Sequence, residues 1–231
     1  MADDRLKRIL AALNSTGTGG SGPGSLCAVA ADVLGVSGAG VMLMSGETAR
    51  GSLCSTNDVS RLIEDLQYTL GEGPCVDAYK LGQVVAEPDL AEPDAPRWLA
   101  FSAKALGAGA RAVFGFPLQV GAARLGALNL YQDQPGRLSD DQHADALVMA
   151  DVVARWVIHA QADSPPDALA SAIESGSEFY LVVHNAAGAV SVQLGVSITE
   201  AMIRLRAYAF THDRLVLDVA KDVVSRKLRF E

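Results

Sequence analysis

Cys75 is the residue best placed for chemistry, because it follows a Gly-Glu-Gly-Pro loop and begins a predicted helical turn. Backbone N–H groups at a helix start lower the pKa of a thiol, which would suit a redox or electrophile sensor or a catalytic nucleophile. The alternative, which we favour, is a small side chain buried under the loop, since free cysteine is among the most buried residue types. A nucleophile also needs a base, and no histidine shares a local motif with Cys75; the four are His143, His159, His184 and His212. We therefore expect no enzymatic activity.

Other familiar chemical motifs are missing from the sequence. Gly71 and Gly73 lie in a glycine-rich loop, but neither GxGxxG nor GxxxxGK[ST] occurs, so a nucleotide cradle is not supported. Cys27, Cys54 and Cys75 are odd in number and widely spaced, with no CxxC pair or Cys/His cluster. We expect no metal site, no cofactor and no disulfide framework.

Positive charge is concentrated near the C-terminus. The chain of 231 residues carries a net charge of −8, yet from Tyr180 onward seven Lys and Arg outnumber five acids. Only this segment suits a polyanion such as nucleic acid. The alternative is an ordinary solvated helix face, with intrahelical pairs between Asp218 and Lys221 and between Asp222 and Arg226.

The C-terminal segment, residues 178–231, reads as three amphipathic helices with short connections, which form a small all-α bundle. Gly195 ends the first helix, and Ser197 to Glu200 has the form of a capping box, in which the serine hydroxyl and the glutamate carboxylate cap each other's backbone N–H. Apolar residues then recur at helical spacing. The third helix is predicted from about Arg214 to Leu228.

The preceding chain alternates helices with short strands. We expect helices over 1–13, 25–34, 58–70, 75–80, 98–106 and 139–161, and strands over 40–44, 49–55, 83–87, 111–120 and 124–132. Adjacent strands joined by short turns predict an α/β (α+β) domain with an antiparallel sheet. Residues 1–24 form an N-terminal helix and flexible loop, 25–161 the sensor-like domain, and 162–177 a linker containing Pro165-Pro166.

Composition favours a folded intracellular protein. Hydrophobic residues make up 49% of the chain, and no apolar run approaches the length needed to span a bilayer. The N-terminus MADDRLKRIL is too short and too charged for a secretory signal. We expect a cytoplasmic location.

Two family resemblances extend this interpretation. The segments GSLCAVAADVLGVSGAGVML, LGEGPCVDAYKLGQVV and VFGFPLQVGAARLGALNLY resemble a GAF domain, a small-molecule sensor fold. This resemblance implies a sensor pocket lined by Tyr68, Glu72, Cys75, Asp77 and Tyr79, and it leaves the ligand open. The GEGPCVDA stretch is similar to the version found in actinobacterial proteins that join GAF to ANTAR.

The run VVHNAAGAVSVQLGVSITEAMIRLRAYAF followed by DVAKDVVSRKL resembles an ANTAR domain, the RNA-binding module of bacterial antitermination regulators. The resemblance implies binding to paired RNA hairpins whose loops are recognised. The expected RNA contacts are Arg204, Arg206, Tyr208, Lys221, Arg226 and Arg229, with His184 and Asn185 as weaker candidates. Tyr208 either stacks on an unpaired base or packs between helices. The family often has Lys where this chain has Ala187, so one basic contact is absent.

Three functional hypotheses follow. The first is a transcription antitermination regulator with a GAF-like sensory and dimerisation domain and an RNA-binding bundle. The second is a ligand-sensing regulator whose bundle binds protein or DNA. The third, which we favour least, is a redox enzyme that depends on Cys75.

Overall fold

The computed structural model describes residues 2–15, 23–45, 48–162, 178–212 and 214–231. The chain divides into two compact units, Met1–Ile173 and Glu174–Glu231, which are described separately below.

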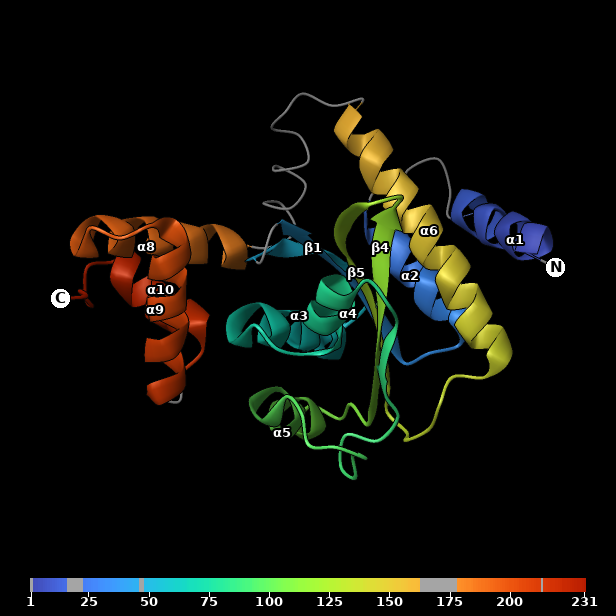
Figure 1. The fold of residues 1–231 in the computed structure, drawn as a ribbon, viewed down its shortest axis with the longest axis horizontal. Coiled ribbons are helices and arrows are strands. Elements are labelled where there is room, and N and C mark those ends of the chain that lie inside the picture. The colour runs from blue at the N-terminus through green and yellow to red at the C-terminus, as the bar shows by residue number, and fades with distance from the viewer. Residues whose placement is uncertain (1, 16–22, 46–47, 163–177, 213) are drawn as a thin grey trace. The chain divides into compact units, whose positions relative to one another are not determined.

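The first unit is organised around one five-stranded sheet (Figure 1). Its strands are β1 (Gly38–Ser45), β2 (Thr48–Ser55), β3 (Val85–Glu87), β4 (Ala112–Val120) and β5 (Ala123–Gln132). The order across the sheet is β2-β1-β5-β4-β3, and every neighbouring pair is antiparallel. The prediction of an α/β domain with an antiparallel sheet is confirmed.

One face of the sheet is covered by α2 (Pro23–Leu34) and α6 (Asp140–Ala162), and α1 (Ala2–Ser15) packs against these two helices (Figure 1). Their buried side chains form one apolar core with those of the strands, including Ile9, Phe116 and Met149. The N-terminal helix therefore contributes directly to this core. As predicted, Ser139 begins α6: its hydroxyl accepts a hydrogen bond from the backbone N–H of Gln142 at 3.2 Å.

The opposite face carries α3 (Asp58–Leu70), α4 (Pro74–Leu81) and α5 (Leu99–Gly107). The Asn57 side chain caps the start of α3, accepting from the backbone N–H of Ser60 at 2.9 Å, while the Ser60 hydroxyl accepts from the N–H of Asn57. Gly71 ends α3 in the left-handed conformation, with φ of 66°, a backbone geometry that glycine adopts without steric penalty.

A disulfide joins Cys27 in α2 to Cys54 in β2, with Cα atoms 6.0 Å apart. Our expectation that the cysteines form no disulfide was wrong. The two residues are 27 positions apart in sequence, and they meet only because α2 folds back over the edge of the sheet. Cys75 is the remaining free cysteine in the described part of the chain, and it is buried.

The second unit is a bundle of three helices, α8 (Glu178–Leu194), α9 (Ile198–Thr211) and α10 (Val216–Val224). The Ser197 hydroxyl accepts from the backbone N–H of Glu200 at 3.2 Å, as predicted. The reciprocal half of the capping box does not form, because the Glu200 carboxylate pairs with Arg204 at 3.0 Å instead.

The last helix is shorter than predicted. It ends at Val224, and Arg226 then adopts the left-handed region with φ of 61°. The backbone N–H groups of Lys227 and Leu228 turn back to the carbonyl of Asp222, at 2.8 and 3.1 Å. This arrangement closes the helix end and directs the last residues away from the helix axis. The Asp222 carboxylate pairs with Arg214 at 2.6 Å, not with Arg226.

In the parts that the structure describes, no single helix is long and apolar enough to cross a membrane. Segments of α8 and α9 reach the required length and composition only as a pair bent by 105°. Within the bundle, Val183, Ala187 and Leu205 from these helices are fully buried.

Candidate functional site

The junction between α3 and α4 brings polar side chains into the interior of the layer that covers the sheet. Gly73 precedes α4 with φ of 130°, a conformation that other residues rarely adopt, and a Cβ there would collide with the Gln67 side chain. The absent side chain lets Gln67 reach the start of α4, where its Oε1 accepts from the backbone N–H of Cys75 at 2.7 Å. This glycine therefore fixes the relation between Gln67 and Cys75.

Four side chains form what we call the sensor cluster: Glu64 and Gln67 of α3, Cys75 of α4 and Asn129 of β5. Glu64, Gln67 and Cys75 are fully buried, and Asn129 is nearly so. The Asn129 amide donates to Glu64 Oε1 at 3.0 Å. Gly40 on β1 makes room for this contact, since a Cβ there would lie 2.5 Å from Glu64 Oε1.

Burial sets the protonation state of the cluster. It raises the pKa of Glu64 to about 8, because a charged carboxylate loses its hydration there; the hydrogen bond from Asn129 opposes this shift only in part. Burial also raises the pKa of the Cys75 thiol, and the nearby Glu64 adds to the effect. Near neutral pH both groups are predominantly protonated, so Cys75 is a thiol and not a reactive thiolate.

Three atoms of the cluster lack hydrogen-bond partners among the described protein atoms: Glu64 Oε2, Gln67 Nε2 and Asn129 Oδ1. Buried polar atoms are costly when unpaired, and native proteins almost always satisfy them with protein, water or ligand. The cluster offers an amide donor, an amide acceptor and a protonated carboxyl. It can therefore hold a water molecule or a small polar group that both donates and accepts.

The five predicted pocket residues lie in one region of the structure. Both carboxylates among them, those of Glu72 and Asp77, accept hydrogen bonds from other parts of the protein. Glu72 Oε1 accepts from the backbone N–H groups of Ala100 and Phe101 at 3.1 and 2.9 Å, capping α5. Asp77 Oδ2 accepts from the Trp98 indole at 2.8 Å. Tyr68 and Cys75 are buried, and Tyr79 is half-buried.

Glu64, Gln67 and Asn129 were not identified from the sequence. A usable pattern was present in α3, where Ser60, Ile63, Glu64 and Gln67 share one helix face at spacings of three and four residues. Polar side chains on a face that also carries buried Ile63 indicate a polar site in the interior. Asn129 had no such pattern, because only strand pairing places it opposite α3.

An apolar hollow of about 560 Å³ lies elsewhere in the first unit, between α1, α2 and α6. Apolar side chains dominate its walls, among them Leu6, Leu10, Leu13, Leu26, Val152 and Trp156. It is on the far side of the sheet from the sensor cluster and contains none of the predicted pocket residues.

In the bundle, several predicted RNA contacts are engaged within the protein. Arg204 pairs with Glu200, and Arg206 is half-buried. The Tyr208 ring stacks on His212 with centroids 3.9 Å apart and lies against Phe230 at 5.3 Å. This packing favours the helix-packing interpretation of Tyr208 over base stacking.

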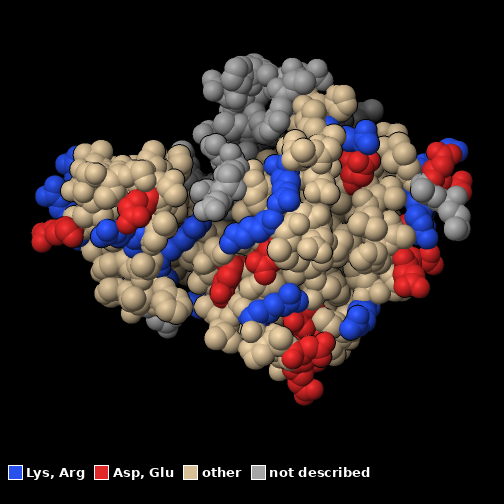
Figure 2. All heavy atoms as spheres, in the orientation of Figure 1, with Lys and Arg blue, Asp and Glu red and all other residues tan. Residues whose placement is uncertain are grey.

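Other predicted contacts are open to solvent. Lys221, Arg226 and Arg229 are exposed, as is Lys227, which was not predicted. Within the described residues none of these four forms an ion pair, in contrast to Arg204 and Arg214. On the face that Figure 2 shows, the bundle carries Lys and Arg with few acids among them. We call Lys221, Arg226, Lys227 and Arg229 the cationic end.

The first bundle helix exposes His184 and Asn185 and buries Ala187 completely. A lysine at position 187 would therefore start from the bundle interior. Gly188 has open space where a Cβ would lie, so no neighbour among the described residues requires a glycine there.

The antiparallel sheet with helices on both faces and a buried polar cluster on one of them defines an α/β domain. A family model described as GAF domain matches residues 24–154, and the chain belongs to this family. Its first unit is thus a GAF sensory domain.

Of three similar solved structures, the first supports this fold. The GAF domain of a phosphoenolpyruvate-protein phosphotransferase from Coxiella burnetii is 14% identical, with a TM-score of 0.51, covering 70% of this chain and 95% of that one. The corresponding Acinetobacter domain is 15% identical, with a TM-score of 0.49 and the same coverages. A type II free methionine-R-sulfoxide reductase from Thermoplasma acidophilum is 17% identical, with a TM-score of 0.39, covering 52% and 78%. No curated protein matches the chain.

Proposed function

We propose that the protein is a transcription antitermination regulator in which a GAF sensory domain controls an RNA-binding bundle. The observation that carries the proposal is the cationic end, four basic side chains without acidic partners among the described residues of an otherwise acidic protein. Such cations on a small helical module suit the phosphates of structured RNA, because each one that meets a phosphate releases a counterion. The ANTAR-like sequence of this segment adds further support.

The sensory input is a small polar ligand at the sensor cluster, where three buried atoms have no hydrogen-bond partner among the described protein atoms. We further propose a cytoplasmic homodimer that performs no catalysis. The apolar hollow between α1, α2 and α6, together with half-exposed Leu147 on α6, supports association through this face. The buried, protonated Cys75 thiol is poorly suited to nucleophilic catalysis.

Binding of the full chain to tandem-hairpin RNA, measured across a salt titration, tests whether the bundle binds RNA. The variant R226A/K227A/R229A should bind about tenfold or more weakly, and the salt slope should fall by up to about 0.9 for each phosphate that the variant no longer neutralises. K7A is the control, since Lys7 is an exposed cation of the first unit that pairs with Asp3, outside the bundle. Equal binding by the triple variant and wild type would place the RNA surface elsewhere. No binding to any hairpin RNA, with or without candidate ligands, would argue against the function itself.

A second candidate function, binding to a protein partner, is favoured by an apolar face on α9. Ile203 and Phe210, seven residues apart on one side of the helix, are 53% and 66% exposed. Exposed large apolar side chains in register on one helix are typical of protein-binding surfaces. If I203S/F210S retains full RNA affinity but loses a partner recovered with the wild-type bundle, this face serves the second function.

A further inference from the structure

The disulfide between Cys27 and Cys54 connects α2 to β2. Cys27 lies in α2, the helix that packs under α1 and α6, and Cys54 lies in β2, an edge strand of the sheet. Because β2 has a hydrogen-bonded neighbour on one side only, the cross-link to α2 is a further constraint on its position, beside β1 and the packing of α2 and α3. The β1–β2 ladder is also irregular, with register shifts after Val41 and Leu43.

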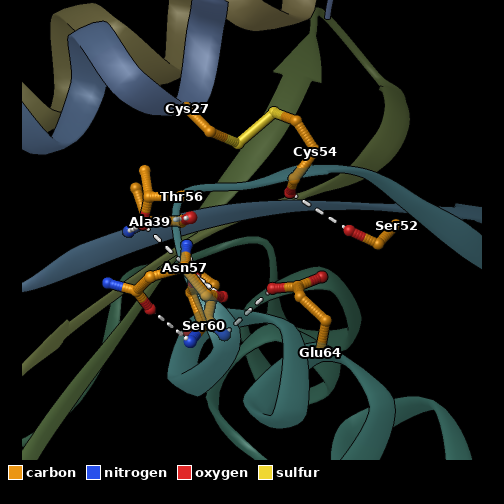
Figure 3. Close-up of a disulfide and its surroundings, with 9 residues drawn as sticks. Cys27, Ala39, Ser52, Cys54, Thr56, Asn57, Ser60 and Glu64 are labelled. Carbon is orange, nitrogen blue, oxygen red and sulfur yellow. Dashed lines mark hydrogen bonds between the residues drawn. A yellow bond between two sulfur atoms is a disulfide. The ribbon is translucent and has the colours of Figure 1, made fainter. Parts of the chain in front are cut away.

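From Cys54 the chain leads directly to the sensor cluster (Figure 3). Two residues later, Thr56 is fixed to β1 by backbone and side-chain hydrogen bonds with Ala39, at 3.0 Å each. Asn57 then caps α3 and accepts a further hydrogen bond from the Tyr131 hydroxyl at 3.1 Å. Glu64 and Gln67 lie on that same helix. Asn57, the cap of this helix, lies three residues after Cys54, so the cross-linked end of β2 is close in sequence to the start of the helix that carries two of the four cluster residues.

Both cysteines can also exist as thiols within this fold. Cys27 is fully buried in the apolar core, and Cys54 is half-buried against it. A reduced cysteine packs as a small apolar side chain, so this environment accepts either form. Cys54 is the more accessible residue of the pair, and we expect a reagent to reach it before Cys27.

We propose that Cys27 and Cys54 form a reversible redox site that couples the thiol–disulfide state of the cell to the order of β2 and the start of α3. The proposal rests on the cytoplasmic location proposed above: in that reducing compartment the two cysteines are thiols, and the disulfide forms under oxidative conditions. The proposal concerns the sensory domain alone and stands whether or not the bundle binds RNA.

The oxidising reaction takes a small-molecule disulfide as its co-reactant. The Cys54 thiolate attacks one sulfur of that disulfide, forms a mixed disulfide and releases one small thiol. The Cys27 thiolate then attacks Cys54 Sγ, which forms the internal bond and releases the second small thiol. The two protein thiols lose two protons and two electrons overall, and the co-reactant is reduced to two thiols.

Intact-protein mass spectrometry tests the chemistry. After equilibration in glutathione buffers of stepped oxidised-to-reduced ratio, the full chain should interconvert between two forms that differ by two hydrogen atoms. Brief alkylation of the reduced native protein should label Cys54 before Cys27, and buried Cys75 should stay unlabelled until denaturation. A pair that stays oxidised under strong reduction, or reduced in excess oxidised glutathione, would overturn the proposal.

Hydrogen exchange tests the coupling. Reduction of the wild type should speed amide exchange in β2 and in the first turn of α3 by about tenfold or more, with α6 unchanged. C27S and C54S should each reproduce the reduced pattern without reductant, because either change removes the disulfide. If C27S folds poorly, the reduced wild type gives the same comparison. Unchanged exchange in β2 and α3 on reduction would show that the bond is only a passive cross-link.

Discussion

The two faces of the sheet differ in the polarity of the side chains that are buried against them. Under α1, α2 and α6 the core consists of apolar side chains, and the nearby buried carboxylate of Asp145 is held by Arg5 at 2.7 Å and by Arg8. Under α3, α4 and α5 the interior includes Glu64, Gln67 and Asn129, with three polar atoms that lack partners among the described residues. One face maximises stability, whereas the other gives up some stability to retain groups that can respond to a ligand or a proton.

The largest expected effect on stability comes from making a cavity in the apolar core. Phe116→Ala removes a fully buried ring from this core and should cost about 3–5 kcal/mol of unfolding free energy, measured by urea denaturation. Leu99→Ala, at a position that is 75% exposed, should change stability by less than about 0.5 kcal/mol. A loss below about 1 kcal/mol for Phe116→Ala would contradict the assignment of this face as the main source of stability.

The next largest effect is the pH-dependent contribution of Glu64, on the polar face, to the stability of the fold. The folded pKa of Glu64 is raised from 4.5 to about 8, so its contribution to stability is fully present below about pH 4.5 and is lost as pH rises through about 8. Relative to Glu64→Gln, the wild type should lose up to about tenfold in the folded-to-unfolded ratio per pH unit in this window. Urea denaturation at pH 5, 6, 7 and 8 measures the difference. Exposed Glu92→Gln serves as the control, and parallel pH profiles for wild type and Glu64→Gln would disprove the buried neutral carboxyl.

The smallest effect compares two acids on α6. Asp145 is buried between Arg5 and Arg8, whereas Asp151 forms an exposed pair with Arg155 at 2.8 Å. Asp145→Asn should lower Tm by about 4 °C or more, since it removes the carboxylate that pairs with Arg8 and one of the two carboxylates that pair with Arg5. Asp151→Asn should lower Tm by less than about 2 °C, because solvent screens the exposed pair. Equal shifts in differential scanning calorimetry would show that α1 is not anchored through Asp145.

Local periodicity was enough to place most elements. Helix α3 was predicted with its observed ends, and β4 and β5 were placed within one residue, because alternating apolar residues and glycine turns act over short distances. The third bundle helix was predicted to begin two residues too early and to end four residues too late; at its end, Arg226 has no side-chain feature that indicates a left-handed backbone. The longer prediction also paired Asp222 with the wrong arginine.

The amino-acid sequence by itself determined the antiparallel sensory domain, the three-helix segment after it and the concentration of positive charge there. The folded structure decided which basic side chains form ion pairs. Within the described residues, Arg204 and Arg214 pair with acidic side chains, whereas the residues of the cationic end do not. The folded structure also brings Cys27 next to Cys54, which is 27 positions away in the sequence, and Glu64 next to Asn129, which is 65 positions away. Side-chain pairing over such separations depends on strand order and helix packing, which no local pattern encodes.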